Sequence, residues 1–207
     1  MLKSYLLENY GYNEPIFLND LKIEELSENA VRQSVKRLVA NGFLERYDNG
    51  IYYIPKQGGL LGKSYLDPFL VIMRKYVRSK TETFGYETGI SLVNKLGLTT
   101  QMPAIIEIVT NREATNGRTV TVGNQKVRIK KAAVEVSDNN AELLQLLDGI
   151  GQSEKYTELT MEDTIDTMRS YVKKKRFTKE QLSEVTSVIT GATAKKLIEW
   201  GMIYEFA

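Results

Sequence analysis

The chain has 207 residues, of which 42% are hydrophobic and 26% charged, a composition typical of a soluble protein with one or two globular domains. Histidine and cysteine are both absent, which excludes the usual zinc sites, Ser-His-Asp triads, Cys-His pairs and disulfides. We therefore expect no catalytic residue, no metal and no cofactor, although magnesium held by carboxylates and catalysis by Lys or Tyr stay open. The absence of cysteine favours a reducing compartment, so we expect a cytoplasmic protein. No apolar run is long enough to span a bilayer, so we expect no membrane partner.

Charge is unevenly distributed along the chain. Residues 58–134 carry 12 basic and 5 acidic side chains, whereas residues 1–57 are close to neutral and residues 135–207 are acidic. This asymmetry indicates either a polyanionic or acidic partner for the middle third, or ion pairing of the middle third with the acidic third inside one fold.

The first 57 residues have the element order of a winged helix-turn-helix. Ser27 is a good N-cap, Gly42 suits a helix C-terminus, and Asn49-Gly50 between two apolar runs is a strong hairpin signal. Apolar spacing and these signals predict helices over 2–10, 20–25 and 28–41, and strands over 43–46 and 51–54. We predict a DNA-binding domain over residues 1–57, followed by a linker at Lys56-Gln57-Gly58-Gly59.

Residues 58–207 are predicted to form an α/β domain that is helical from about residue 139, so the whole chain belongs to the α+β class. The predicted helices are 65–77, 85–96, 140–149, 161–175, 179–189 and 192–200, and the predicted strands are 104–109, 119–122 and 126–129.

The third predicted helix has two chemically different sides. Val31, Val35, Leu38 and Val39 form an apolar stripe, and polar side chains project from the opposite side. Arginine suits guanine, and asparagine or glutamine suits adenine, so this side is that of a major-groove reader. The predicted DNA-binding residues are Asn29, Arg32, Gln33 and Lys36 for bases, Arg37 and Arg46 for phosphates, and Tyr47 and Asn49 for sugar or the minor groove.

The alternative for this domain is a winged helix that contacts only proteins. Its net charge of −1 favours that alternative, since DNA-binding domains are usually basic. The acids, however, gather before the third helix, at Asp20, Glu24, Glu25 and Glu28.

A second candidate surface lies in the basic middle third. Lys126, Arg128 and Lys130 alternate with apolar residues on one predicted strand, at a spacing of about 6.6–6.8 Å that is close to a phosphate repeat. Arg112 and Arg118 flank a neighbouring polar loop. These five residues are a candidate antitoxin or polyanion surface, and the alternative is a solvated strand face.

Two stretches of the chain resemble the AbiE-type antitoxin family. The first runs from Ala30 to Arg46 and includes Arg37-Leu38-Val39-Ala40-Asn41-Gly42-Phe43-Leu44-Glu45-Arg46, and it is followed by Gly50-Ile51-Tyr52-Tyr53-Ile54-Pro55. The second is Phe84-Gly85-Tyr86-Glu87-Thr88-Gly89 with Leu96-Gly97-Leu98-Thr99-Thr100-Gln101-Met102-Pro103, followed by a strand that ends at Val109-Thr110-Asn111. Thr88-Gly89 departs from the family's usual alanine-containing pair. The resemblance covers roughly residues 1–135.

This resemblance implies a type IV toxin–antitoxin (abortive infection) protein active in phage defence. Its N-terminal domain would repress its own promoter at an inverted repeat in double-stranded DNA. The next domain would neutralise a cognate nucleotidyltransferase-like toxin without a stable complex. One alternative is a transcriptional regulator with a C-terminal ligand-sensing or dimerisation domain. The other is an enzyme that uses the winged helix for targeting, which the missing His and Cys disfavour.

Overall fold

The computed structural model describes residues 1–24, 26–56, 58, 62, 64–115 and 117–206 and has a mixed α+β fold. The chain divides into two compact units. The first contains Met1–Arg74 with Val122–Gln125, and the second contains Lys75–Thr121 with Lys126–Ala207. Of the predicted linker, Gln57 and Gly59 lie outside the described residues, so a domain boundary at residue 57 stays a prediction.

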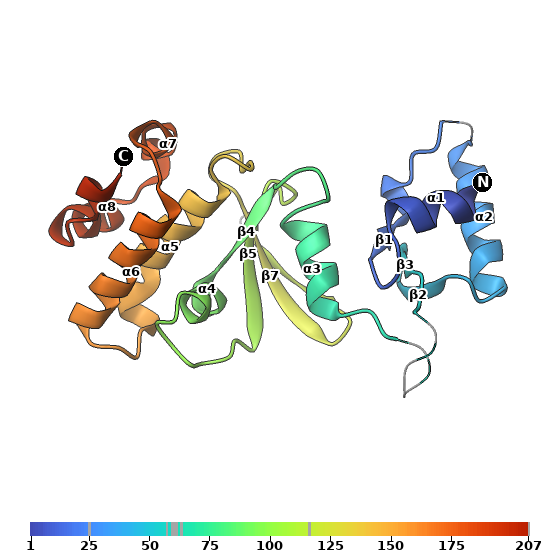
Figure 1. Ribbon diagram of the computed structural model, residues 1–207, viewed down its shortest axis with the longest axis horizontal. Coiled ribbons are helices and arrows are strands. Elements are labelled where there is room, and N and C mark those ends of the chain that lie inside the picture. Colours follow the sequence, from blue (N-terminus) through green and yellow to red (C-terminus); the bar gives the residue numbers. More distant parts are fainter. Residues whose placement is uncertain (25, 57, 59–61, 63, 116, 207) are drawn as a thin grey trace. The chain divides into compact units, whose positions relative to one another are not determined.

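The first unit alternates helices with short strands (Figure 1). Its elements are α1 (Leu2–Asn9), β1 (Ile16–Phe17), the 3₁₀ turn η1 (Leu18–Asp20), α2 (Glu28–Ala40), β2 (Glu45–Asp48), β3 (Ile51–Tyr53) and most of α3 (Pro68–Tyr76). The three strands form an antiparallel sheet in the order β1-β3-β2. The predicted Asn49-Gly50 hairpin turn is confirmed, and Gly50 adopts φ 71°, which favours glycine.

One apolar core joins α1 and α2 to the sheet of this unit. Leu6 from α1, Val31 and Val35 from α2, and Ile16 from β1 are buried in the same cluster. The apolar stripe that the sequence predicts on residues 28–41 therefore faces the core. Ser27 caps α2 as predicted, because its hydroxyl accepts a hydrogen bond of 3.3 Å from the backbone N–H of Ala30.

The predicted second helix over residues 20–25 is wrong for the residues that the structure describes. Asp20 ends η1 and residues 21–24 are not helical, while Glu25 lies outside the described residues. Leu21 and Ile23 explain the difference, because both pack into the core while Lys22 and Glu24 are exposed. This alternation has a period of two, which fits an extended segment, whereas a helix would turn Leu21 and Ile23 to different sides.

The second unit contains a four-stranded sheet and a group of helices. Its elements after α3 are β4 (Gly85–Thr88), α4 (Gly89–Lys95), β5 (Ile105–Thr110), β6 (Arg118–Val122), β7 (Gln125–Lys131), α5 (Ala141–Tyr156), α6 (Met161–Lys175), α7 (Lys179–Glu184), η2 (Thr186–Val188), α8 (Gly191–Glu199) and η3 (Met202–Glu205). The strand order is β4-β5-β7-β6, in which β4 and β5 are antiparallel and β5 and β7 are parallel.

The predicted helix over residues 85–96 is wrong in its first third, where β4 pairs with β5. A Cβ atom on Gly85 would lie 2.3 Å from the carbonyl oxygen of Tyr76 and 2.7 Å from that of Val109. Gly89 then begins α4 with φ 70°, a left-handed conformation that separates the strand from the helix.

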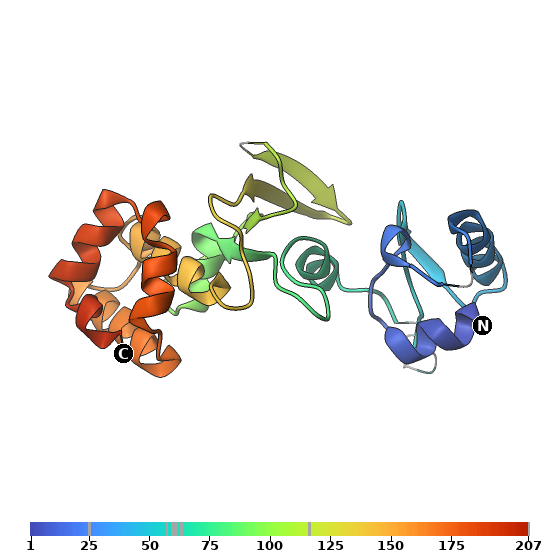
Figure 2. The same ribbon diagram turned by 90° about the horizontal axis from the view of Figure 1, so that it is seen from above.

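The helical C-terminal part is confirmed from residue 141 onward. Its helices gather as one group in both Figure 1 and Figure 2 and share a core that includes Leu146, Ile150, Met168 and Trp200. Helix α6 has the predicted bounds, α5 runs seven residues beyond the predicted end at 149, and the predicted helix 179–189 is divided into α7 and η2. In the part of the chain that the structure describes, no helix has the length and apolarity needed to cross a bilayer.

Candidate nucleic-acid interface

Helix α2 presents its predicted base-reading side chains to solvent. Buried Val31 and Val35 hold the opposite side of the helix in the core. The predicted contact residues on the outer side are all exposed: Asn29, Arg32, Gln33, Lys36 and Arg37. Side chains three and four positions apart share a helix face, so this side offers several hydrogen-bond donors and three positive charges on one surface.

An ion pair within α2 involves the central arginine of this surface. The Arg32 guanidinium lies 4.0 Å from the Glu28 carboxylate one turn earlier, and both side chains are largely exposed. Pairs of this kind contribute about 0–1 kcal/mol, so Arg32 can leave Glu28 for a stronger partner at little cost. Glu28 also lies in the first turn of α2, where the helix dipole favours an acid.

The tip of the β2–β3 hairpin brings two more of the predicted residues together. Arg46 donates to the Asn49 side-chain oxygen at 3.2 Å and to the Asp48 carbonyl at 3.3 Å, so its guanidinium folds over the turn. Both Arg46 and Asn49 remain exposed. Tyr47 is only partly exposed, and burial raises the pKa of its hydroxyl. Arg46 and Asn49 are therefore more accessible to a ligand than Tyr47.

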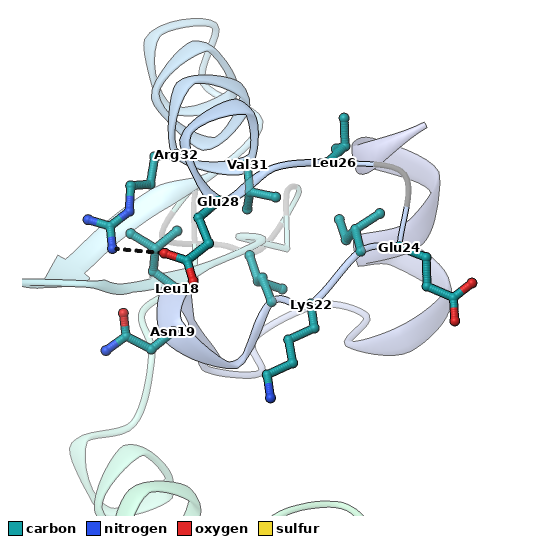
Figure 3. Close-up of a pocket in the computed structure, with 10 residues that line it drawn as sticks. Leu18, Asn19, Lys22, Glu24, Leu26, Glu28, Val31 and Arg32 are labelled. Atoms are coloured by element: carbon teal, nitrogen blue, oxygen red, sulfur yellow. Dashed lines mark ion pairs between the residues drawn. The ribbon is translucent and has the colours of Figure 1, made fainter.

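A pocket of about 480 Å³ lies beside α2, between the start of that helix and the segment from Leu18 to Glu24, with Leu26 also in its lining (Figure 3). Its walls include Leu21 and Val31, and its rim includes Lys22, Glu28 and Arg32. The pocket occupies the region where the sequence predicted a helix. The period-two spacing of Leu21 and Ile23 is the sequence signal that would have indicated an extended segment there.

The basic residues of the second unit are less available than their sequence suggests. Lys130 forms an ion pair with Glu107. Arg118 donates to the Glu113 carboxylate at 2.8 Å, and hydrogen bonds from Thr115, followed by that from Arg118, lower the pKa of Glu113 to about 2.

Arg112, the other arginine beside this loop, also has partners. Its guanidinium lies 3.5 Å from the centre of the Phe84 ring and donates to the Lys75 carbonyl at 3.0 Å.

Lys126 and Arg128 are the exposed members of the predicted stripe on β7. The alternation itself is confirmed, since Val127 and Ile129, which alternate with the three cations along β7, are buried.

Glu107 joins this surface through the tertiary structure. It lies on β5 opposite Arg128 of β7, in a parallel pairing that no local sequence pattern indicates. A parallel register places paired residues on the same face of the sheet. The basic stripe therefore has an acidic neighbour, which reduces its net charge.

A polar network between β4 and α5 is also absent from the sequence-based predictions. The Thr88 hydroxyl donates to Asp148 at 2.8 Å and accepts from Gln152 at 2.8 Å. Burial raises the pKa of Asp148 and also that of Tyr86 beside it. These hydrogen bonds connect the helical part to the sheet. In the sequence, Thr88, Asp148 and Gln152 do not differ from other polar residues.

Within the described residues, no group of three or more acidic, His or Cys side chains is placed to hold a metal ion. Comparison with curated proteins found no match. The chain does match a protein family over residues 12–178, which is most of its length. The protein therefore belongs to DUF6088, a family of unknown function.

Proposed function

We propose that residues 1–57 form a winged helix-turn-helix that binds double-stranded DNA, and that the protein represses its own promoter. The observation that carries the proposal is the outer side of α2, where Arg32, Gln33 and Lys36 are exposed opposite the buried Val31 and Val35. The element order α1-β1-η1-α2-β2-β3 and the sheet order β1-β3-β2 support it, with α2 as the reading helix and the β2–β3 hairpin as the wing.

The non-helical segment before α2 is compatible with this function. In a helix-turn-helix the helix before the reader mainly positions it, and here Leu21 and Ile23 anchor the segment in the core without forming a helix. A single reading helix covers only a few base pairs, so we expect two chains on an inverted repeat in the promoter.

A gel-shift assay with the chain's own upstream DNA tests this proposal. Arg32→Ala should weaken binding by about 1–3 kcal/mol, or roughly 5- to 150-fold, and relax the preference for one base position. Lys195→Ala is the matched control, because Lys195 also pairs with a glutamate on an exposed helix turn, at 3.6 Å from Glu199. Unchanged affinity and base preference in Arg32→Ala would refute the role of α2.

The same proposal assigns antitoxin activity to the second unit, against a nucleotidyltransferase-like toxin and without a stable complex. Support comes from the resemblance of residues 85–103 to AbiE-type antitoxins and from the exposed cations Lys126 and Arg128. On this proposal the protein is not an enzyme, needs no cofactor and acts in the cytoplasm.

Cell survival during toxin expression tests the antitoxin activity. The double change Lys126→Ala/Arg128→Ala should reduce protection and leave promoter repression intact, because both residues lie outside the winged helix. Lys130 is left unchanged because it neutralises Glu107. The matched control is Lys174→Ala/Lys179→Ala, which removes two exposed lysines of the helical part. Full protection by the folded Lys126/Arg128 variant would remove this surface from the mechanism.

A further inference from the structure

The pocket beside α2 has an apolar interior. Its lining includes the buried Leu21 and Val31 and the partly buried Leu18, Ile23 and Leu26. Its volume of about 480 Å³ falls within the range of about 300–1,000 Å³ that is usual for small-molecule sites. Apolar side chains around a space of this size can bury the hydrocarbon part of a ligand.

The rim of this pocket carries its charged groups. Arg32 and Glu28 line it from α2 and form an ion pair, which Figure 3 marks with a dashed line. Lys22 and Glu24 line it from the segment before α2, and both are exposed. In Figure 3 the Glu24 carboxylate points away from the Arg32 guanidinium, whereas the Glu28 carboxylate lies beside it.

Arg32 is available to a better acceptor than Glu28. Within the part of the chain that the structure describes, Glu28 is the ionic partner of Arg32, at 4.0 Å, which is too long for a hydrogen bond. A guanidinium binds a carboxylate best through a pair of parallel N–H···O hydrogen bonds. The pocket also lies at the start of α2, where the helix dipole favours negative charge. A carboxylate therefore suits this side of the pocket better than a cation or a neutral group.

We propose that this pocket binds a small aliphatic monocarboxylate, with its hydrocarbon chain against Leu21 and Val31 and its carboxylate on Arg32. The ligand displaces Glu28 from Arg32 at little cost, because an exposed ion pair of this kind contributes little to stability. Arg32 is also a base-reading residue of the proposed function. On that function, on which this step alone rests, the carboxylate and DNA compete for Arg32, so the ligand is an inducer that releases the promoter.

A titration of the full chain with octanoate, followed by heteronuclear NMR, tests the site without DNA. The backbone N–H signals of residues 18–24 and 26–32 should shift. The affinity should be at least tenfold lower for butanoate, which has a shorter chain to bury, and for octan-1-ol, which has no charge. No shift in these residues, or equal affinity for the three compounds, would overturn the proposal.

Two variants test the contact with Arg32 through effects of opposite sign. Arg32→Gln should weaken octanoate binding at least tenfold, whereas Glu28→Gln should strengthen it, because it removes the carboxylate that competes for Arg32. Lys195→Gln is the matched control, since Lys195 also pairs with a glutamate on an exposed helix turn but does not line the pocket. Weaker binding by Glu28→Gln, or unchanged binding by a folded Arg32→Gln variant, would contradict the proposed arrangement.

A gel shift with the chain's own upstream DNA separates this proposal from the repressor function. Octanoate should release the wild-type protein from DNA, and butanoate at the same ionic strength should not. DNA binding that persists while NMR shows the pocket occupied by octanoate would contradict the inducer role. A chain that binds octanoate in the pocket but never binds the DNA contradicts the repressor function alone, and a chain that binds the DNA but not octanoate contradicts the pocket alone.

Discussion

Replacing Gly85 by alanine tests the strand β4 against the helix that the local sequence favours. In an exposed helix, changing glycine to alanine would stabilise the protein by up to about 1 kcal/mol. In the structure the new Cβ would lie 2.3 Å from the Tyr76 carbonyl oxygen and 2.7 Å from the Val109 carbonyl oxygen. Cβ atoms essentially never approach another heavy atom closer than 3.0 Å, so backbone must move on both sides.

The cost of this movement is that of overpacking a rigid site. Such substitutions usually cost 1–3 kcal/mol, and we expect about 2–3 kcal/mol here because both neighbours are backbone atoms that cannot rotate away. For a chain of this size that corresponds to a fall in melting temperature of roughly 4–12 °C. A helix at Gly85 therefore predicts that Gly85→Ala stabilises the protein, whereas strand β4 predicts that the same substitution destabilises it.

Urea denaturation followed by tryptophan fluorescence measures the change. Trp200 is the chain's one tryptophan and is buried in the core of the second unit, so its emission reports the unit that contains Gly85. Gly191→Ala is the control, because Gly191 begins α8 and a Cβ there has no neighbour within 4 Å. Equal or greater stability of Gly85→Ala would refute the close approach of the two carbonyls and with it the pairing of β4.

Three further substitutions test the cap, the pH dependence and the first core. Ser27→Ala should cost the first unit about 1 kcal/mol in a thermal melt, and no change would mean that the bond to Ala30 contributes nothing. Leu6→Ala should cost about 2–5 kcal/mol because Leu6 is fully buried, and a loss below 1 kcal/mol would contradict that core. Hydrogen bonds from Thr100 lower the pKa of Glu158 from 4.5 to about 2, so the stability it contributes is present above pH 4.5 and lost as the pH falls toward 2. Glu158→Gln should flatten that part of a pH-denaturation profile, and an unchanged profile would contradict the contribution of Glu158.

Several elements were predictable because short-range physics determines them. Helix α2 was predicted to within one residue, since Ser27, the 3.6-residue apolar stripe and Gly42 are all local signals. The hairpin turn at Asn49-Gly50 and helix α6 were predictable for the same reason. The exposure of Arg32, Gln33 and Lys36 follows from the stripe on the other side of α2.

The predicted helix over residues 20–25 failed because tertiary packing outweighed a local signal. The segment 21–24 was predicted as helix from a capping residue, but the alternating burial of Leu21 and Ile23 prevailed. A single cap contributes only about 1 kcal/mol, less than burying two large apolar side chains. The burial of Leu21 and Ile23 therefore outweighed the weaker preference of the capping residue for a helix.

The sequence by itself determined the α+β class, the helical C-terminal part, the exposed polar side of α2 and the alternation of cations on β7, because each depends on a period or a turn within a few residues. Only the tertiary structure decided that Lys130 is neutralised by Glu107, that Gly85 lies between two carbonyl oxygens, and that Glu158 holds the loop before Met102. Each of these contacts joins residues on different elements or loops, and all but the one between Gly85 and Tyr76 join residues more than 20 positions apart. No local pattern encodes such partners, since their pairing depends on how β4, β5, β7 and the α5–α6 turn come together in the folded chain.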